Sequence, residues 1–191
     1  MKSFEEFLNE KRVSNTVITK KLIDTPELYI ALGDNNMPKV AELLSNGANP
    51  DIMTPVQGYT LLIYTIRKQL EDAFKLLLEH GADVNKSDTS HNTPLHTCVA
   101  YQDRDYFLEL LLKEGANPNI ANSDHQTPIE LIFDMAKNIW VDDFAKYFEL
   151  LLKHGAKVDY YILEEFKKPK PSNKNYEKLK EVYKKYHPNG L

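Results

Sequence analysis

The groups that could act chemically in this chain are a single thiol and six imidazoles. Cys98 stands two residues after His96, which makes the two side chains a candidate pair of nucleophile and base. His91 and His96 are five residues apart with no cysteine pair nearby, so they match no recognised metal-ligand spacing. The seven glycines form no loop of the kind that cradles a phosphate group. Apart from this candidate pair, the sequence predicts no catalytic residue, no metal site and no cofactor.

The composition is that of an ordinary globular chain. It has 191 residues, of which 42% are hydrophobic and 27% are charged, so there is enough apolar material for a continuous core. No segment approaches the ~20 consecutive apolar residues that cross a bilayer, so no membrane partner is predicted. A lone cysteine, Cys98, favours a reducing compartment such as the cytoplasm, or the host cytoplasm for a viral protein. The net charge of −4 argues against nucleic acid covering the whole surface.

The elements that must position any functional side chain are repeated. A phrase of the form Leu-Leu-x-x-Gly-Ala occurs four times, with steps of 34, 34 and 40 residues between its glycines. A second phrase, which begins with threonine, lies upstream of each copy. Two phrases that alternate in this way indicate one structural unit that is used four times. The glycines are Gly47, Gly81, Gly115 and Gly155, and the threonines are Thr25, Thr60, Thr93 and Thr127.

Each unit is predicted to contain two short helices joined by a polar turn. A threonine oxygen can cap the first helix, and a proline directly after it, as in Thr93 and Pro94, loses no N–H that the helix needs. Apolar residues then recur at helical spacing, for example Leu95, Cys98 and Val99. The glycine that follows the second helix supplies the left-handed residue that ends it. Because such a unit cannot bury its apolar faces alone, neighbouring units must stack.

The chain resembles the ankyrin-repeat family, whose unit of about 33 residues carries the phrases Thr-Pro-Leu-His and Gly-Ala-Asp-Val-Asn. Both phrases occur in register, at residues 93–96 and 81–85, and the resemblance covers residues 24–160, which is 137 of 191 residues. It implies an all-α solenoid of about four helix–turn–helix repeats, with short β-hairpin-like fingers and helical caps. The predicted domains are an N-terminal amphipathic helix or leader (1–22), an ankyrin-repeat domain (23–160, with repeats at about 24–57, 58–90, 91–124 and 125–160) and a lysine-rich C-terminal cap helix (161–191).

The register of this resemblance implies structural roles for the residues that first suggest chemistry. Cys98 takes a position that the family usually fills with alanine packed between helices. His96 corresponds to the family's structural histidine, which is expected to hydrogen-bond backbone near a finger. His91 and His125 occupy the turn of the finger, where the family usually has glycine. An insertion around residues 137–143 makes the fourth unit the longest, and it should lengthen the helices of that unit or their joining turn.

Residues 1–22 are amphipathic, with Phe4, Phe7 and Leu8 on one face of a predicted helix that would cover the first repeat. The first ten residues also resemble the head-targeting leader of internal proteins of large tailed phages. A prohead protease cuts such leaders after a Leu-x-Glu site, which here would end at Glu10. On this alternative interpretation the chain is a phage-encoded, head-packaged or anti-defence effector that inhibits a host protein.

The C-terminal part is rich in lysine. Residues 166–187 contain eight lysines and two glutamates, and residues 167–174 include two prolines that interrupt any helix. A final helix is predicted at about 176–186, with Leu179, Val182, Tyr183 and Tyr186 on one side. It is interpreted as a soluble cap on the last repeat, or alternatively as a site for nucleic acid or another anionic partner. The cap is favoured because basic and aromatic residues do not alternate as in base-stacking segments.

The residues left for recognition are those that differ between units, because the repeated ones are constrained by folding. Stacked repeats present their finger loops and inner helices along one concave surface, and Tyr, Trp and Arg most often dominate binding energy. We therefore expect a non-catalytic protein–protein interaction module, monomeric in its favoured state, that binds a protein partner mainly through Tyr59, Arg67, Tyr101 and Trp140. The full set of predicted partner-binding residues is Met53, Val56, Tyr59, Arg67, Thr89, Ser90, Asn92, Tyr101, Asp124, Gln126 and Trp140.

Overall fold

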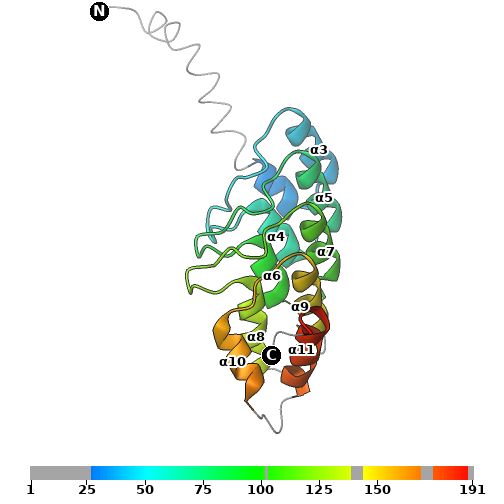
Figure 1. Ribbon diagram of the computed structural model, residues 1–191. Helices are drawn as coiled ribbons and strands as arrows, with labels where there is room; N and C mark the ends of the chain where they lie inside the picture. Colours follow the sequence, from blue (N-terminus) through cyan, green and yellow to red (C-terminus); the bar gives the residue numbers. More distant parts are fainter. Residues whose placement is uncertain (1–26, 102, 139–143, 169–173, 189–191) are drawn as a thin grey trace, which may run out of the picture.

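The computed structural model describes residues 27–101, 103–138, 144–168 and 174–188, and its helices stack in two rows (Figure 1). Loops connect the outer row of one helix pair to the inner row of the next, and they project from one side of the stack (Figure 1). The predicted all-α solenoid is thus confirmed. The inner row is the helix 27–33, α4 (Leu61–Lys68), α6 (Pro94–Ala100), α8 (Pro128–Asn138) and α10 (Tyr160–Lys167), and the outer row is α3 (Met37–Ser45), α5 (Glu71–Glu79), α7 (Asp105–Lys113), α9 (Phe144–Lys153) and α11 (Lys174–Tyr186).

Three of the repeated threonines, Thr60, Thr93 and Thr127, stand at the starts of inner helices. The Thr60 hydroxyl accepts a hydrogen bond from the backbone N–H of Ile63 at 3.3 Å and caps α4. At the start of α8 the carboxylate of Glu130 accepts hydrogen bonds from the backbone N–H and the hydroxyl of Thr127, at 2.7 and 2.8 Å. These bonds satisfy donors at the helix start that have no partner within the helix. The threonine phrase therefore sets where α4, α6 and α8 begin.

The repeated glycines end the outer helices. Gly47, Gly81, Gly115 and Gly155 all have φ between 82° and 86°, the left-handed conformation that an added Cβ would strain. A Cβ at the last three of these positions would meet no heavy atom within 4 Å. Backbone conformation, and not lack of space, is therefore the reason for glycine at these helix ends.

Other turns use left-handed residues that are not glycine. His91 and His125 have φ of 58° and 59° at the turns of two finger loops, the position that the sequence predicts for them. Asn35, Gln69 and Asp103 have φ of 53° to 57° in the turns between the paired helices. The last three are spaced by 34 residues, so the turn geometry repeats with the sequence even where the residue type does not.

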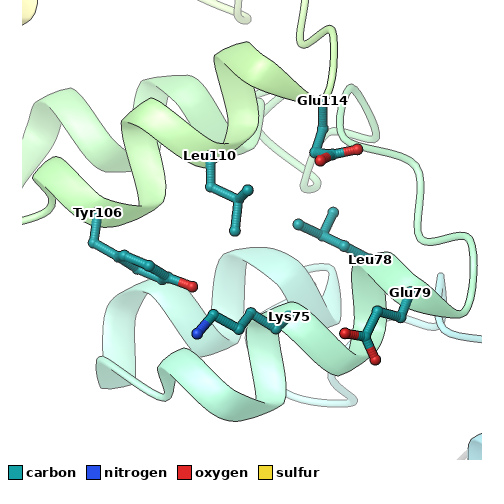
Figure 2. Close-up of a pocket in the computed structure, with 6 residues that line it drawn as sticks. All are labelled: Lys75, Leu78, Glu79, Tyr106, Leu110 and Glu114. Atoms are coloured by element: carbon teal, nitrogen blue, oxygen red, sulfur yellow. The ribbon is translucent and has the colours of Figure 1, made fainter.

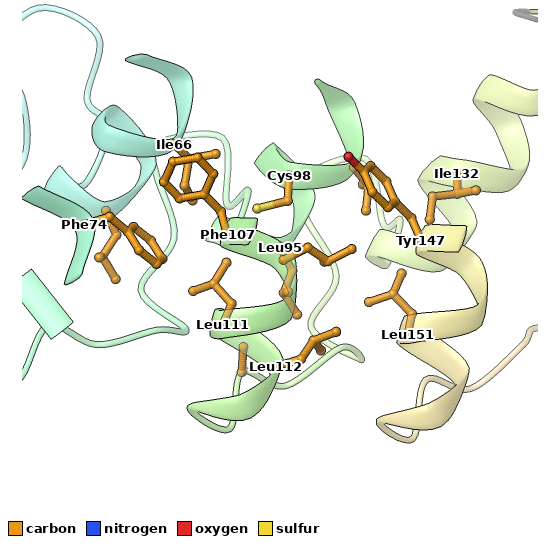
Figure 3. Close-up of a cluster of buried hydrophobic side chains, with 14 of the residues drawn as sticks. Ile66, Phe74, Leu95, Cys98, Phe107, Leu111, Leu112, Ile132, Tyr147 and Leu151 are labelled. Atoms are coloured by element: carbon orange, nitrogen blue, oxygen red, sulfur yellow. The ribbon is translucent and has the colours of Figure 1, made fainter. Parts of the chain in front are cut away.

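The core runs along the stack between the two rows. Phe74 on α5 meets Phe107 on α7 edge to face, with ring centroids 5.0 Å apart. Leu111 and Leu151 point into the same cluster from α7 and α9, and Cys98 enters it from α6 (Figure 3). Because each helix pair covers the apolar face of the next, the core is one continuous cluster over the described residues.

The fourth unit is lengthened, as its insertion predicts. Its inner helix α8 has 11 residues, whereas α6 has seven, and its outer helix α9 has ten, whereas α7 has nine. Residues 139–143, which join α8 to α9, lie outside the described residues, and so does the predicted anchor Trp140.

The C-terminal helices form a further pair at the end of the stack. Leu179 and Tyr183 of α11 are buried, and Val182 and Tyr186 pack against the same core, so the predicted apolar side of this helix is confirmed. The Lys185 ammonium lies 2.8 Å from the carboxylate of Glu149 on α9. Among the described helices, none is long and apolar enough to cross a bilayer.

We predict that Leu111→Ala lowers the free energy of unfolding by about 2–5 kcal/mol, because it leaves a cavity in a fully buried site. Urea denaturation followed by circular dichroism measures the change. The control is Lys113→Ala, which alters an exposed residue two positions along the same helix and should change stability by less than about 0.5 kcal/mol. Equal effects of the two variants would contradict the stacked core described here.

Candidate functional site

The finger loops are stacked on one another by hydrogen bonds. The backbone N–H of Thr89 donates to the carbonyl of Gly58 at 3.2 Å, and that of Ser123 donates to the carbonyl of Ser90 at 3.1 Å. A Cβ at Gly58 would lie 2.5 Å from the Thr89 methyl carbon, so glycine allows this close approach. The finger loops therefore form a row with a set spacing, on which the predicted contact residues stand.

Each finger is also closed internally by one polar side chain. The Asp88 carboxylate accepts hydrogen bonds from the backbone N–H groups of Ser90 and Asn92, both at 2.9 Å. Asn122 makes the same pair of bonds one unit later, to Asp124 and Gln126, both at 3.0 Å. These side chains hydrogen-bond the backbone of their own loops, so they determine the shape of each finger. The outer residues of the finger take no part in these bonds.

The predicted contact residues on the fingers divide into exposed and occupied ones. Val56 is 83% exposed and Met53 is 36% exposed. The side chain of Asn92 accepts a hydrogen bond from Asn122 at 3.0 Å, and the amide of Gln126 donates to Asp134. Asn92 and Gln126 are therefore engaged within the protein. The residues that lie exposed at the finger tips are Met53, Val56, Thr89, Ser90 and Asp124.

Three predicted anchors from different elements lie in contact. The guanidinium of Arg67, in the last turn of α4, lies 4.5 Å from the ring centroid of Tyr59 on the preceding finger and 4.7 Å from that of Tyr101 at the end of α6. Both distances are within the range of a cation–π interaction. We call Tyr59, Arg67 and Tyr101 the aromatic–arginine cluster. The structure thus brings together three of the four side chains that the sequence predicts as anchors.

A second arginine, which is not among the residues predicted from the sequence, supports this cluster. Arg104 is only 7% exposed, and its Nε donates to the carbonyl of Ile66 at 2.8 Å. Its guanidinium lies 5.8 Å from the ring centroid of Tyr101. The corresponding position one unit earlier is Leu70. A charged residue at a position that is apolar in the neighbouring unit was the feature of the sequence that could have singled out Arg104. Arg104 thus ties the end of α4 to the start of α7 beneath the exposed cluster.

The C-terminal end of the same side is acidic. A hollow of about 190 Å³ lies between the last finger and α10, and three of its lining residues carry carboxylates. Phe133 forms part of its apolar wall. The inner side therefore changes from arginine-bearing to carboxylate-bearing along the stack. The residues that line this hollow are His125, Gln126, Glu130, Phe133, Asp134, Asp159, Tyr161 and Ile162.

The candidate thiol–imidazole pair is used for folding. Cys98 is fully buried, and burial raises the pKa of its thiol, which disfavours the reactive thiolate. The Nδ1 atom of His96 accepts the backbone N–H of Thr93 at 3.1 Å, so Nε2 carries the proton and donates to the carbonyl of Gln126 at 2.8 Å. His96 therefore holds the next finger, the backbone role that the resemblance implies. Among the described residues, no group of three His, Cys, Asp or Glu side chains could hold a metal ion.

The model of the ankyrin repeats, in three copies, matches residues 28–122. The chain is an ankyrin-repeat protein. Such repeats are typically protein–protein interaction modules and are generally non-catalytic. The predicted phage leader gains no support, because residues 1–10 lie outside both the matched segment and the described residues.

Relatives of this ankyrin-repeat protein match it over part of their length. It is 32% identical over 74 residues to an ankyrin repeat-containing protein of Schizosaccharomyces pombe, a match that covers 39% of this chain and 35% of that protein. It is 36% identical over 78 residues to the Notch protein of Drosophila melanogaster, which covers 41% of this chain and 3% of Notch. The ankyrin repeat domain of Bcl-3 is similar in structure, with a TM-score of 0.51 and 27% identity over 55% of this chain and 45% of that chain. The chain thus spans about a third or less of these two curated relatives.

We predict that native Cys98 reacts with Ellman's reagent about 100-fold or more slowly than the thiol of the urea-unfolded chain, because reaction requires local opening of the core. Absorbance at the thiol-release wavelength measures both rates. Rapid, stoichiometric labelling in native buffer would show that the thiol is accessible.

We predict that the stability of the protein falls as the pH drops below about 6.5 in part because of His96. Burial lowers the pKa of the His96 imidazole from its ordinary value of 6.5, while its bond to Gln126 opposes the shift. Between the folded-state pKa and 6.5 the unfolded chain binds more protons, so acid favours unfolding.

Urea denaturation at pH 7.5 and pH 5.5 tests this prediction against His96→Gln, whose amide can keep the bond to the Thr93 N–H. The parent should lose more stability on acidification than the variant does, because the other histidines are common to both. Equal losses in the two proteins would exclude His96 as a source of the pH dependence.

Proposed function

We propose that this ankyrin-repeat protein binds a protein partner through its finger tips and inner helices, at a surface centred on the aromatic–arginine cluster. The observation that supports this most is the contact of Arg67 with Tyr59 and Tyr101, at 4.5 and 4.7 Å. These three side chains come from a finger and two successive inner helices, and all of them are partly exposed. They lie outside the buried core, so folding leaves them available for recognition.

The residue types and their neighbours suit a protein interface. Tyrosine and arginine are the types most enriched at the positions that dominate binding energy. Val56, at the tip of the finger that carries Tyr59, exposes an apolar side chain that no buried contact explains. An apolar tip beside a cationic, aromatic centre offers a partner both desolvation and directional bonds. A protein surface with a similar mixture of groups is the proposed ligand.

A hollow on the opposite row of helices is a competing location. It measures about 430 Å³ and lies between the outer helices α5 and α7, where Leu78 and Leu110 face each other (Figure 2). The Lys75 ammonium lies 5.3 Å from the ring centroid of Tyr106 at one end of it. Glu79 and Glu114 stand at the other end (Figure 2). Because this hollow and the cluster are on different rows, variants can separate their contributions.

We predict that replacing Tyr59, Arg67 and Tyr101 together by alanine weakens partner binding by about 100-fold or more, because truncation of hot-spot residues costs ~2 kcal/mol or more each. Affinity capture from cells that contain the protein identifies the partner, and titration calorimetry with the purified partner gives the dissociation constant. The free energy of unfolding should change by no more than about 1 kcal/mol, since exposed cation–π contacts contribute little to folding.

The matched control replaces Lys75, Glu79 and Glu114 by alanine, which alters three residues of the outer hollow and should leave partner affinity unchanged. If the outer variant loses binding and the cluster variant keeps it, the proposed surface is wrong. A parallel loss of affinity and stability in the cluster variant would instead assign these residues to folding.

A further inference from the structure

We propose that Arg67 binds a carboxylate of an acidic segment in the protein partner, an inference that rests on the proposed function of the same surface. The aspartate or glutamate side chain would approach in the plane of the guanidinium, between the rings of Tyr59 and Tyr101.

The guanidinium of Arg67 lies against two aromatic rings. Its contacts with Tyr59 and Tyr101 engage the π faces of the two rings. Over the part of the chain that the structure describes, no hydrogen bond or ion pair engages the guanidinium of Arg67. A guanidinium has five N–H donors in a planar fork, and this fork matches a carboxylate through two parallel bonds. The cluster therefore holds a positioned donor group without an acceptor among the described residues.

The second arginine nearby, Arg104, differs from Arg67 because its guanidinium donates hydrogen bonds within the protein. Arg104 donates from Nε to the carbonyl of Ile66 at 2.8 Å and from a terminal nitrogen to the carbonyl of Asp103 at 3.1 Å. It is buried, and its guanidinium lies 5.8 Å from the ring centroid of Tyr101. Lys68, next to Arg67 at the end of α4, is exposed and adds another positive charge. The local field therefore favours an anionic group at Arg67.

The charges along the inner side select where an acidic segment can lie. Glu130, Asp134 and Asp159 line the hollow at the C-terminal end, so carboxylates of a partner are repelled there. The cluster at α4 and α6 carries the opposite charge. An acidic segment is thus directed toward Arg67 by attraction to the cluster and by repulsion from the C-terminal hollow.

A carboxylate fits this site better than a phosphate does. Sites for phosphorylated peptides usually combine several arginines on one dianionic group. Here Arg104 is buried and bonded to backbone carbonyls, which leaves one guanidinium with open donors at the cluster. A single negative charge on a planar group matches a single planar cation. We therefore assign the carboxylate, and the experiment includes phosphate as the opposing outcome.

The test uses a displayed library of random linear peptides selected on the full chain. We expect the selected peptides to carry Asp or Glu at a recurring position. In a synthetic peptide, replacing that residue by its amide should weaken binding to the parent chain about 10-fold or more, the effect of losing a charge-assisted bidentate bond. Arg67→Gln should weaken the unmodified peptide similarly, and the two changes together should add little further loss.

Two control variants separate the contribution of the planar guanidinium donors of Arg67 from that of its positive charge. Lys68→Gln also removes one positive charge from the end of α4, and it should weaken the acidic peptide by less than about 3-fold. Arg67→Lys keeps the charge but removes the planar fork, so its affinity should fall between those of the parent and Arg67→Gln. The amide-substituted peptide leaves the protein unchanged, so its loss of affinity for the parent chain does not depend on how the variants fold.

The outcomes distinguish this inference from the function on which it rests. If the acid-to-amide loss is equally large in the parent chain and in Arg67→Gln, Arg67 does not bind the carboxylate and the inference is overturned. The proposed surface still stands in that case, provided that alanine at Tyr59, Arg67 and Tyr101 abolishes peptide binding. If that triple variant binds the selected peptides as the parent does, the proposed function itself is wrong. Binding that requires phosphorylated peptides, or displacement by inorganic phosphate and not by acetate, would assign a phosphate and overturn the carboxylate.

Discussion

Apolar side chains in this protein are buried between adjacent repeat units, and the rest of the structure depends on that constraint. A two-helix unit of about 34 residues is too small to enclose its own apolar side chains. Leu77, Leu111 and Leu151 are fully buried because the next or the previous pair lies against them. At the C-terminal end the final pair supplies Phe166 and Leu179 to the same core. Stacking therefore determines which side of each unit remains exposed. The side that carries the finger loops is not covered by a neighbouring unit.

Local rules in the sequence predict the repeated elements well. Helix caps, left-handed turns and helical spacing depend on a few adjacent residues, so Thr60, Gly81 and His91 could be assigned before the structure was known. The helix α10 was not anticipated, because it lacks both repeated phrases and is capped instead by Asp159, whose carboxylate accepts the N–H of Tyr161 at 2.8 Å. A cap of this kind is visible in a sequence only when a helix is already expected there.

The sequence predicts which positions of the candidate site vary between units, but it does not predict how their side chains are arranged in space. Tyr59, Arg67 and Tyr101 were chosen because their positions vary between units, and the structure shows that they touch. The role of Arg104 depends on the carbonyl of Ile66, 38 residues earlier, which no local pattern reveals. Conversely, His96 and Cys98 carry reactive groups, yet one bonds backbone and the other is buried. The reactivity of a side-chain type therefore says little about its role until its neighbours in the structure are known.

The hydrogen bonds between successive fingers have a consequence for molecular recognition. Thr89 and Ser123 each tie one loop to the loop before it through backbone atoms. Separate flexible loops would each lose conformational entropy when a ligand ordered them, and that loss would weaken association. Here the loops are ordered together during folding, so an incoming molecule meets a surface whose ordering cost has already been met. Substitutions at the exposed tips can then change what is recognised without changing how the loops are held.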